Sequence, residues 1–343
     1  MRILIVVPAQ SHATGNWVTA ERFRRRLTDL GHTVLVLQTE IRPEPDFSYR
    51  INQFNPSVSL LLHAYRSGYP WLNISAAKAV PLVTLLTGTD VNQGLADPVQ
   101  QKTIRTVLSR SNIILLQNRK LFRHILAFDE SLSQKLFYLP PGVELGSAPC
   151  DLRRRIGLSE KTLLFFCPAG IRPVKGVLSL LEMCDLVAQE RHDFHIVFSG
   201  PILDEAYADA FFKALEQRPF ATYLGIIEPQ AMAAAIKSAD VIVNNSVAEG
   251  IPNSLMEAAR LGVPILAREI PGNAEIVNHP DIGMLYQDTN LFKVLVLRLF
   301  LDREKLKQPH IANPTLYDPL HEAEVLERQL KNAVLCLPHG RIV

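Results

Sequence analysis

Residues 241–267 read VIVNNSVAEGIPNSLMEAARLGVPILA, and this stretch decides the fold. The apolar run at 241–244 is typical of a buried parallel strand, since both faces of such a strand are covered. Residues 252–261 predict a helix that ends at Gly262, and a second apolar run follows at 264–267. Strand, helix and strand in this order form a βαβ unit, so the two strands are expected to be parallel.

The same alternation runs through the second half of the chain before this stretch. Strands are predicted at 163–167, 195–199 and 221–224, and helices at 176–189, 204–217 and 229–238. Strands that alternate with helices predict a doubly wound parallel sheet.

The first half repeats the pattern, with strands predicted at 3–7, 34–37, 58–62, 82–86 and 113–116 and helices at 18–30 and 100–108. Pro140 and Pro141 end this series and open a linker. We therefore predict an α/β protein of two tandem Rossmann-like, doubly wound domains with an interdomain cleft, at 1–148 and 149–312. A last helix in 313–343, near 320–335, is expected to cross back to the first domain.

The composition is that of a globular protein. The chain has 343 residues, 48% of them hydrophobic and 20% charged. Its longest apolar runs are shorter than the roughly 18 to 20 residues of a membrane span, and MRILIVVPAQ fits a buried strand better than a signal peptide. The four cysteines show no metal-ligand spacing, so we predict free thiols in a reducing cytoplasm and no metal: Cys150, Cys167, Cys184 and Cys336.

Charge is distributed unevenly along the chain. Residues 1–150 carry 16 Lys and Arg against 10 Asp and Glu, a net +6, and the remainder carries 20 against 24, a net −4. A basic first half suits an anionic acceptor or a lipid surface, and the segment 17–26 could give peripheral contact with the inner face of a membrane. The alternative is that these charges, Arg22 among them, form solvated helix faces.

The loop at 245–257 has the chemistry of a phosphate site. Pro252 suits the first helical position, which would leave the amides of the next three residues, Asn253, Ser254 and Leu255, without intrahelical acceptors at a positive dipole end. Glu257 lies about 7.5 Å further along the helix, a distance suited to a ribose beyond a diphosphate. Glu249, just before Gly250 and Ile251, would face the transferred sugar. The alternative is an ordinary helix start with one exposed Glu.

The loop at 169–176, which reads AGIRPVKG, precedes the helix predicted after the 163–167 strand. Gly170 allows close approach of the backbone, and Arg172 and Lys175 could neutralise a departing diphosphate without metal. Two solvated surface charges are the alternative.

Three loops of the first half also follow predicted strands and therefore point to the same edge of their sheet. Gly15 and Asn16 precede a helix without a GxGxxG fingerprint, which argues against a dinucleotide cofactor. His63 and Arg66 lie in HAYRSG, and Thr87 and Asp90 lie in TGTDVN; all four are candidates for binding sugar or acceptor. His63 is equally compatible with a buried structural histidine, and Asp90 with the cap of a turn.

Glu249 and Glu257 form an E-x7-E motif that resembles the donor site of retaining glycosyltransferase family 4, the group 1 transferases. The segments TGNWVTAERFRRRLTDLGH, LTGTDVN, GIRPVKG and REIPGNAEIV resemble a small set of glycosyltransferase 1 domain-containing proteins and, more distantly, the bacterial selenosugar synthases. The resemblance covers nearly the whole chain. It implies a GT-B fold, a nucleotide-diphosphate sugar donor and retention of anomeric configuration by front-face attack.

The resemblance also implies roles for single residues. It assigns Arg172 and Lys175 to the diphosphate, Glu257 to the ribose and Glu249 to the donor sugar. The two cations are closer together here than in many members of the family. Thr87 stands where many members have a His, and His63 is the candidate to replace that His in catalysis.

We therefore expect transfer of a hexose or N-acetylhexosamine from a nucleotide sugar, UDP being favoured, to a small-molecule, glycan or lipid-linked acceptor. No cofactor, metal or nucleic acid is expected. Three alternatives remain: a selenosugar or thiosugar synthase that uses the same donor, a nucleotide-sugar epimerase, and a nucleotide-sugar binding protein without catalysis. An epimerase needs an acid/base pair at the sugar, and the sequence shows no clear partner for Glu249.

Overall fold

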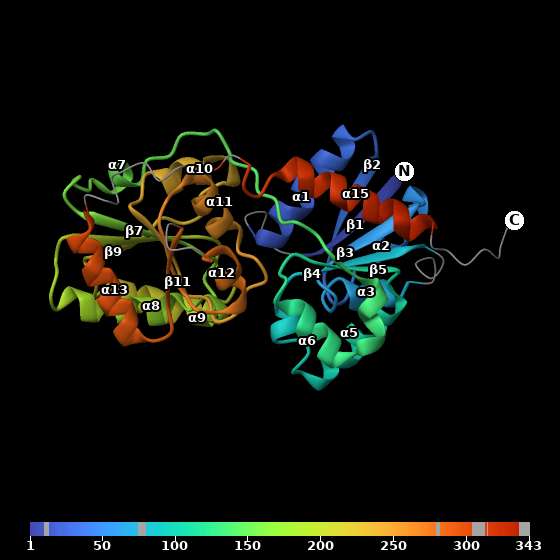
Figure 1. Ribbon diagram of the computed structural model, residues 1–343, viewed down its shortest axis with the longest axis horizontal. Helices are drawn as coiled ribbons and strands as arrows, with labels where there is room; N and C mark the ends of the chain where they lie inside the picture. Colours follow the sequence, from blue (N-terminus) through green and yellow to red (C-terminus); the bar gives the residue numbers. More distant parts are fainter. Residues whose placement is uncertain (10–13, 75–79, 279–281, 304–312, 314, 336–343) are drawn as a thin grey trace, which may run out of the picture. The chain divides into compact units, whose positions relative to one another are not determined.

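The computed structural model describes residues 1–343 apart from 10–13, 75–79, 279–281, 304–312, 314 and 336–343. The chain divides into two compact units, each built around one six-stranded sheet (Figure 1). The first unit comprises Met1–Gly142 and the segment from Asp318, and the second comprises Val143–Tyr317. The prediction of two Rossmann-like α/β domains is confirmed.

The first sheet is parallel throughout and has the strand order β2-β1-β3-β4-β5-β6. Its strands are β1 (Arg2–Pro8), β2 (Thr33–Thr39), β3 (Val58–Leu62), β4 (Leu82–Leu86), β5 (Ile113–Leu116) and β6 (Leu136–Tyr138). Its helices are α1 (Gly15–Asp29), α2 (Phe47–Phe54), α3 (Gly68–Leu72), α4 (Thr89–Asn92), α5 (Pro98–Arg110), α6 (Leu121–Phe128), the 3-10 turn η2 (Glu130–Lys135) and α15 (Pro319–Leu335).

The second sheet is also parallel, in the order β12-β11-β10-β7-β8-β9. Its strands are β7 (Leu163–Pro168), β8 (Phe194–Ser199), β9 (Ala221–Tyr223), β10 (Val241–Asn244), β11 (Ile265–Arg268) and β12 (Gly283–Tyr286). Its helices are α7 (Leu152–Ile156), the 3-10 turn η3 (Pro173–Lys175), α8 (Val177–Ala188), α9 (Glu205–Leu215), α10 (Pro229–Lys237), α11 (Asn253–Leu261), α12 (Pro271–Ile276) and α13 (Thr289–Leu301).

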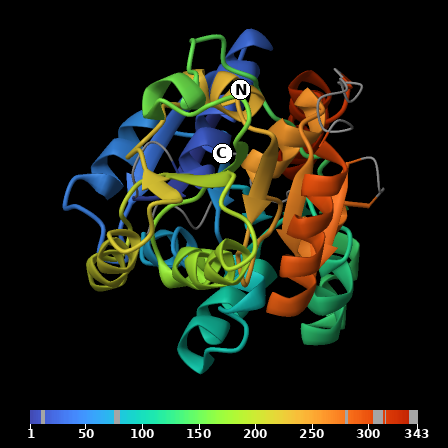
Figure 2. The same cartoon turned by 90° about the vertical axis from the view of Figure 1, so that its left-hand side faces the viewer.

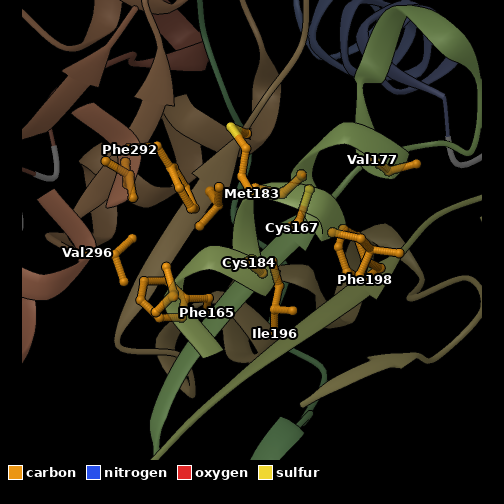
Figure 3. Packing of buried hydrophobic residues seen from close by; sticks show 14 of the residues in the cluster. Phe165, Cys167, Val177, Met183, Cys184, Ile196, Phe198, Phe292 and Val296 are labelled. Carbon is orange, nitrogen blue, oxygen red and sulfur yellow. The ribbon is translucent and has the colours of Figure 1, made fainter. Parts of the chain in front are cut away.

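Successive residues of β7 enter two different cores. Phe165 and Cys167 pack with α8, α9 and α13 on one face, as Figure 3 shows, whereas Leu164 and Phe166 pack with α10 and α11 on the other. Figures 1 and 2 show the helices on both faces of this sheet. A strand covered on both faces needs apolar residues at every position, which explains the unbroken apolar run.

Helix α15 packs against the first unit through α1. Leu326, Leu330 and Ala333 share a core with β1 and α1, and Arg22 of α1 forms a buried ion pair with Glu322, with Nε 2.7 Å from Oε2. The expectation that Arg22 is a solvated surface residue is therefore wrong, because its side chain is only 2% exposed. An arginine buried at a helix contact needs a carboxylate partner that the linear sequence does not reveal.

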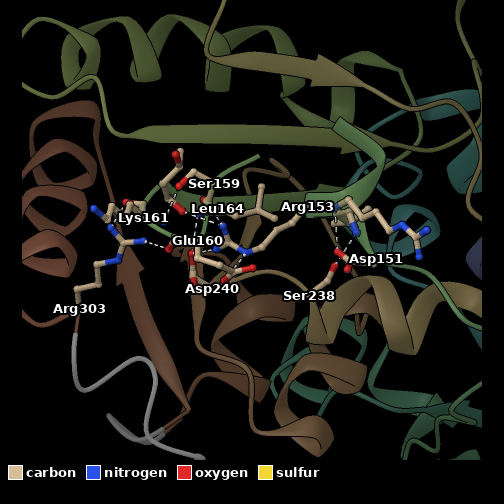
Figure 4. A network of polar contacts seen from close by, with 12 residues as sticks. Asp151, Arg153, Ser159, Glu160, Lys161, Leu164, Ser238, Asp240 and Arg303 are labelled. Atoms are coloured by element: carbon tan, nitrogen blue, oxygen red, sulfur yellow. Dashed lines mark hydrogen bonds and ion pairs between the residues drawn. The ribbon is translucent and has the colours of Figure 1, made fainter. Parts of the chain in front are cut away.

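A polar network fixes the amino end of the second sheet (Figure 4). Arg153 donates to the carbonyl oxygens of Ser159 and Thr162, each at 3.0 Å, and to Asp240 Oδ2 at 2.5 Å. Asp240 also accepts from the amide of Leu164, at the start of β7. These contacts join the amino ends of β7 and β10. The carboxyl ends of the two strands therefore lie in a fixed register at the opposite edge of the sheet.

Candidate active site

The loops that follow β7 and β10 lie next to each other, because these two strands are neighbours in the second sheet. The amide of Val247 donates to the carbonyl oxygen of Val174 at 2.9 Å, which joins the two loops directly. Ligands of open parallel sheets bind at this carboxyl edge. The structure thus brings together the two segments to which the sequence assigned the donor.

Helix α11 begins one residue later than predicted. Pro252 is the N-cap, with φ −76° and ψ 121°, and Asn253 is the first helical residue. The prediction that the Leu255 amide is unpaired is wrong, because it donates to the Pro252 carbonyl oxygen at 3.1 Å in a tight first turn. Among the described residues, the amides of Asn253 and Ser254 have no acceptor. These two amides, at the positive end of the helix dipole, are the anion-binding groups of this loop.

Lys175 and Glu249 form an ion pair, in which the ammonium nitrogen Nζ contacts Oε1 of the carboxylate. The side chain of Lys175 is 18% exposed and that of Glu249 is 12% exposed. The alternative of a solvated surface lysine is therefore excluded by the geometry. The pair places the residue expected at the diphosphate in contact with the residue expected at the sugar.

The carboxylate of Glu249 is kept ionised by its surroundings. Burial raises its pKa, but the charge of Lys175, hydrogen bonds from Lys175 and Ser246, and the charge of Arg172 together outweigh burial. The net pKa lies below the ordinary value of 4.5. Glu249 is thus an anionic hydrogen-bond acceptor and is unsuited to act as a general acid near neutral pH.

Arg172 lies at the start of η3 and differs from Lys175 in its partners. Its Nε atom is buried, and the described residues offer it no acceptor. Burial lowers the pKa of Arg172, an effect that the nearby charge of Glu249 partly offsets. A guanidinium with a buried, unused donor, on a loop joined to the one that leads into α11, is suited to an anionic ligand.

The buried amide side chain of Asn245 holds the loop after β10 in place. Asn245 donates through Nδ2 to the Gly176 carbonyl oxygen at 2.7 Å, and its Oδ1 accepts from the Tyr286 hydroxyl at 2.8 Å. Gly176 is left-handed, with φ +59°, and a Cβ there would lie 2.6 Å from the Asn245 carbonyl oxygen. Only glycine fits this close approach without strain.

A small pocket of about 190 Å³ opens beside this loop, on the side of α8 and α13. It is lined by Ser179, Glu182, Met183, Asn245, Arg268, Tyr286, Gln287, Asp288 and Thr289. These residues come from four separate segments of the chain, so no local motif marks them as one site.

The remaining donor candidates lie around the same loops. Glu257 is on α11 and is 8% exposed, and Gly250 is buried, with Ile251 half-buried beside it. Gly170 lies against Leu203, whose Cδ1 would be 2.8 Å from an added Cβ. This close packing explains why position 170 is a glycine, whether or not a ligand binds there.

In the first unit, Gly15 and Asn16 are the first residues of α1 rather than a loop before it, and Gly15 is exposed. Residues 11–13, which come shortly before them in the sequence, lie outside the described residues.

His63 has a left-handed backbone, with φ +82°, directly after β3. Its Nδ1 accepts from the amides of Tyr65 and Arg66, at 3.3 and 3.1 Å, so the imidazole proton of the neutral ring is on Nε2. Nε2 lies 3.2 Å from the Thr89 hydroxyl. This arrangement makes His63 a hydrogen-bond donor through Nε2 and commits its Nδ1 lone pair to the loop.

Asp90 organises the turn after β4. Its Oδ1 accepts from the amides of Thr87 and Gly88, each at 3.0 Å, and its Oδ2 accepts from the amide of Ala64 at 2.8 Å. The side chain is fully buried. These contacts match the capping alternative, and a role in binding the acceptor stays a prediction.

The basic stretch of α1 is largely neutralised within the protein. Arg24 pairs with Glu21, and Arg26 lies 3.5 Å from Asp29, while Arg22 is buried against α15. Membrane contact through this helix therefore stays a prediction, without support from free charge at these three positions.

No helix of the described residues is long and apolar enough to cross a membrane. The described residues also contain no cluster of three or more His, Cys, Asp or Glu side chains that could hold a metal ion. Burial raises the pKa of Cys167 to about 12, and Cys184 is likewise buried and its pKa raised. Neither thiol is suited to act as a nucleophile.

The chain is similar in sequence to known proteins. Residues 151–312 match the family model of glycosyl transferases group 1. Glycosyltransferase 1 domain-containing protein 1 of Xenopus tropicalis is 26% identical over 335 residues, which cover 96% of this chain and 95% of that protein. N-acetyl-alpha-D-glucosaminyl L-malate synthase of Bacillus anthracis is 23% identical over 231 residues, 66% of this chain and 60% of that one.

Solved structures share the fold. HepE of Anabaena, in complex with UDP and glucose, aligns with a TM-score of 0.75 and 15% identity, over 96% of this chain and 99% of that chain. Sucrose-phosphate synthase of Thermosynechococcus elongatus aligns with a TM-score of 0.77 and the same identity and coverage. Such identities show the fold alone, which is the GT-B fold of two Rossmann-like domains. In sequence, residues 151–312 are thus similar to the glycosyl transferases of group 1.

Proposed function

We propose that this chain, as a glycosyltransferase of group 1, transfers a sugar from a nucleotide-diphosphate sugar to an acceptor with retention of anomeric configuration. The observation that carries the proposal is the meeting of Arg172, the Lys175–Glu249 pair and the open amides of α11 at one strand edge. Cations and helix amides at such an edge stabilise the charge of a leaving diphosphate.

Arg172 is the primary ligand of the diphosphate in this proposal. Its buried Nε has no acceptor among the described residues, whereas the charge of Lys175 is already balanced by Glu249. A planar guanidinium can bind two phosphate oxygens at once, so it adds direction as well as charge. Lys175 would then be shared between the phosphate and Glu249.

Glu249 accepts hydrogen bonds from hydroxyl groups of the donor sugar, and Glu257 does so from the ribose. The lowered pKa of Glu249 fits this role, because an ionised carboxylate is a stronger acceptor than a neutral one. Two further donor contacts are assigned to the loop backbone at Gly250 and Ile251.

The chemical step needs no carboxylate nucleophile. The bond between the anomeric carbon and the phosphate oxygen breaks, the acceptor oxygen attacks the same face, and the leaving phosphate oxygen takes the acceptor proton. Arg172, Lys175 and the α11 amides would neutralise the diphosphate, so we propose that transfer proceeds without metal. The Nε2 proton of His63, with Arg66 and Thr87, is assigned to the acceptor side.

UDP is the proposed nucleotide, because HepE, which shares the fold, was crystallised with UDP and with UDP-glucose. A thermal-shift screen of UDP, GDP and their sugars tests this, since a ligand that binds only the folded chain raises the melting temperature. Acceptor panels for the best donor should include selenophosphate, whose product would be identified by mass spectrometry as a selenosugar. If no nucleotide or nucleotide sugar stabilises the chain, the proposal fails.

A further inference from the structure

Ser246 lies behind Glu249 and is almost completely buried. Its hydroxyl donates to Oε1 of Glu249 at 2.7 Å, and Ser246 as a whole is only 1% exposed. Lys175 contacts the same carboxylate oxygen. Ser246 therefore cannot reach a ligand itself, and its effect on a ligand must pass through Glu249.

Ser246 is in turn fixed by two buried asparagines. Its amide donates to Oδ1 of Asn244 at 2.9 Å, and the same oxygen accepts from Nδ2 of Asn273 at 3.2 Å. Asn273 also donates to the Arg268 carbonyl oxygen at 2.9 Å. Asn244 is 6% exposed and Asn273 is fully buried. Both hydrogen bonds of the Asn273 amide nitrogen are thus made inside the protein, whereas its Oδ1 has no partner among the described residues. Buried hydrogen bonds of this kind restrain the geometry of Asn244 and Ser246.

Gly272 brings α12 against Glu249 from a third side. A Cβ at this position would lie 2.7 Å from both Cβ and the carbonyl oxygen of Glu249, and 2.8 Å from the carbonyl oxygen of Gly250. The loops after β7 and β10 thus meet at the carboxylate of Glu249, and the segment after β11 packs against its Cβ and backbone. The position of Glu249 is therefore set by contacts with Lys175, Ser246 and Gly272.

We propose that Ser246 is a positioning residue that holds the Glu249 carboxylate toward the donor sugar when Lys175 turns to the diphosphate. This rests on the proposed function. Two donors on Oε1 fix the plane of the carboxylate and hence the direction of Oε2. A phosphate is an anion and competes with Glu249 for the ammonium group of Lys175. The hydroxyl of Ser246 is buried, so a phosphate cannot reach it. Ser246 therefore keeps Glu249 in place throughout donor binding.

The test compares UDP with UDP-glucose by titration calorimetry on the full chain. Ser246→Ala should leave the affinity for UDP within about twofold and weaken UDP-glucose about tenfold, the loss expected when a hydrogen bond to a charged group is removed. Ser246→Thr, which keeps the hydroxyl, should restore most of the loss. Ser238→Ala is the matched control, because its hydroxyl binds backbone groups at the opposite edge of the sheet.

A double-mutant cycle separates positioning from general weakening. Glu249→Gln should also lose selectivity for UDP-glucose over UDP, and adding Ser246→Ala to it should cost no more. If Ser246→Ala weakens UDP and UDP-glucose equally, or adds fully to Glu249→Gln, the proposal is overturned.

A second measurement needs no ligand. Carbon-13 labelling of glutamate gives the pKa of Glu249 by NMR, assigned with Glu249→Gln. The pKa should rise in Ser246→Ala, where a donor to the carboxylate is lost, and stay low in Ser246→Thr and Ser238→Ala. An unchanged pKa in Ser246→Ala overturns the proposal. If the unsubstituted chain binds neither UDP nor UDP-glucose, the proposed function fails, and this titration alone decides the role of Ser246.

Discussion

Lys175 and Glu249 are 74 positions apart in the sequence, and in the folded chain the Nζ of one contacts the Oε1 of the other. The pair joins the loops after β7 and β10, which are adjacent only because of the strand order. Because of this pair, the two cations of the GIRPVKG loop, Arg172 and Lys175, have different surroundings. Lys175 has an internal counterion, whereas Arg172 keeps a buried donor that no described residue uses.

We expect Arg172→Ala to weaken UDP binding by about 10- to 150-fold, the equivalent of about 1.5–3 kcal/mol for hydrogen bonds to a charged group. Lys175→Ala should weaken UDP less, because Glu249 already balances its charge. Arg191→Ala is the control, since Arg191 pairs with Asp193 on the surface, with both side chains over 40% exposed. Calorimetry with UDP measures all three. Equal losses at Arg172 and Lys175 would contradict the division of roles.

The contribution of Glu249 to the stability of the fold should decrease as the pH is lowered. Its pKa is lowered below 4.5 in the folded chain, so its contribution is complete above about pH 4.5 and is lost as the pH falls through the folded value. Glu249→Gln should therefore have a lower free energy of unfolding than the unsubstituted chain, and the difference should be largest at neutral pH. The gap should narrow in acid. Urea denaturation at several pH values checks this, and a gap that widens below pH 4.5 would show that the sign is wrong.

Gly272→Ala should displace Glu249, because the added methyl would lie 2.7 Å from atoms of that residue. We expect turnover of the donor to fall at least tenfold, together with a loss of stability of about 1–3 kcal/mol from overpacking. Gly31→Ala is the comparison, since φ is +83° there and no atom lies within 4 Å of the added methyl. That variant should lose about 1 kcal/mol and keep its activity. Intact turnover in Gly272→Ala would mean that the loops adjust freely.

Asp90→Asn should cost about 1–3 kcal/mol of stability, because an amide nitrogen would face the Ala64 amide that Oδ2 now accepts from. Asp29→Asn, at a side chain that is 65% exposed, should change stability by less than about 0.5 kcal/mol. Urea denaturation compares the two. Full stability in Asp90→Asn, with a raised KM for an acceptor, would instead favour a role in substrate binding.

Glu322→Ala should destabilise the first unit by about 3–5 kcal/mol, because it leaves Arg22 buried without its carboxylate. Glu327→Ala, on the same helix but 20% exposed, should cost less than about 1 kcal/mol. A double replacement, Arg22→Met with Glu322→Leu, should recover much of the loss, as for other buried ion pairs replaced by apolar residues. A similar loss in the double and the single variant would indicate that the charges themselves are required.

The sequence alone determined the alternation of strands and helices and the order of the loops at the strand ends. Apolar runs such as 163–167 and 241–244, and a helix end such as Gly262, are local signals that survive without tertiary context. Short edge strands such as β6 and β12 were not predicted. They consist of three and four residues and are mostly half-buried, so their apolar pattern is weak.

Only the tertiary structure decided which side chains meet. That Lys175 reaches Glu249, that Ser246 holds the same oxygen and that Gly272 closes the third side depend on β10 lying between β7 and β11. The order of strands in the sheet cannot be predicted from the spacing of residues along the chain. Each βαβ unit has the same sequence pattern wherever it lies in the sheet. The Arg22–Glu322 pair, 300 positions apart, is decided in the same way by the docking of α15 on α1.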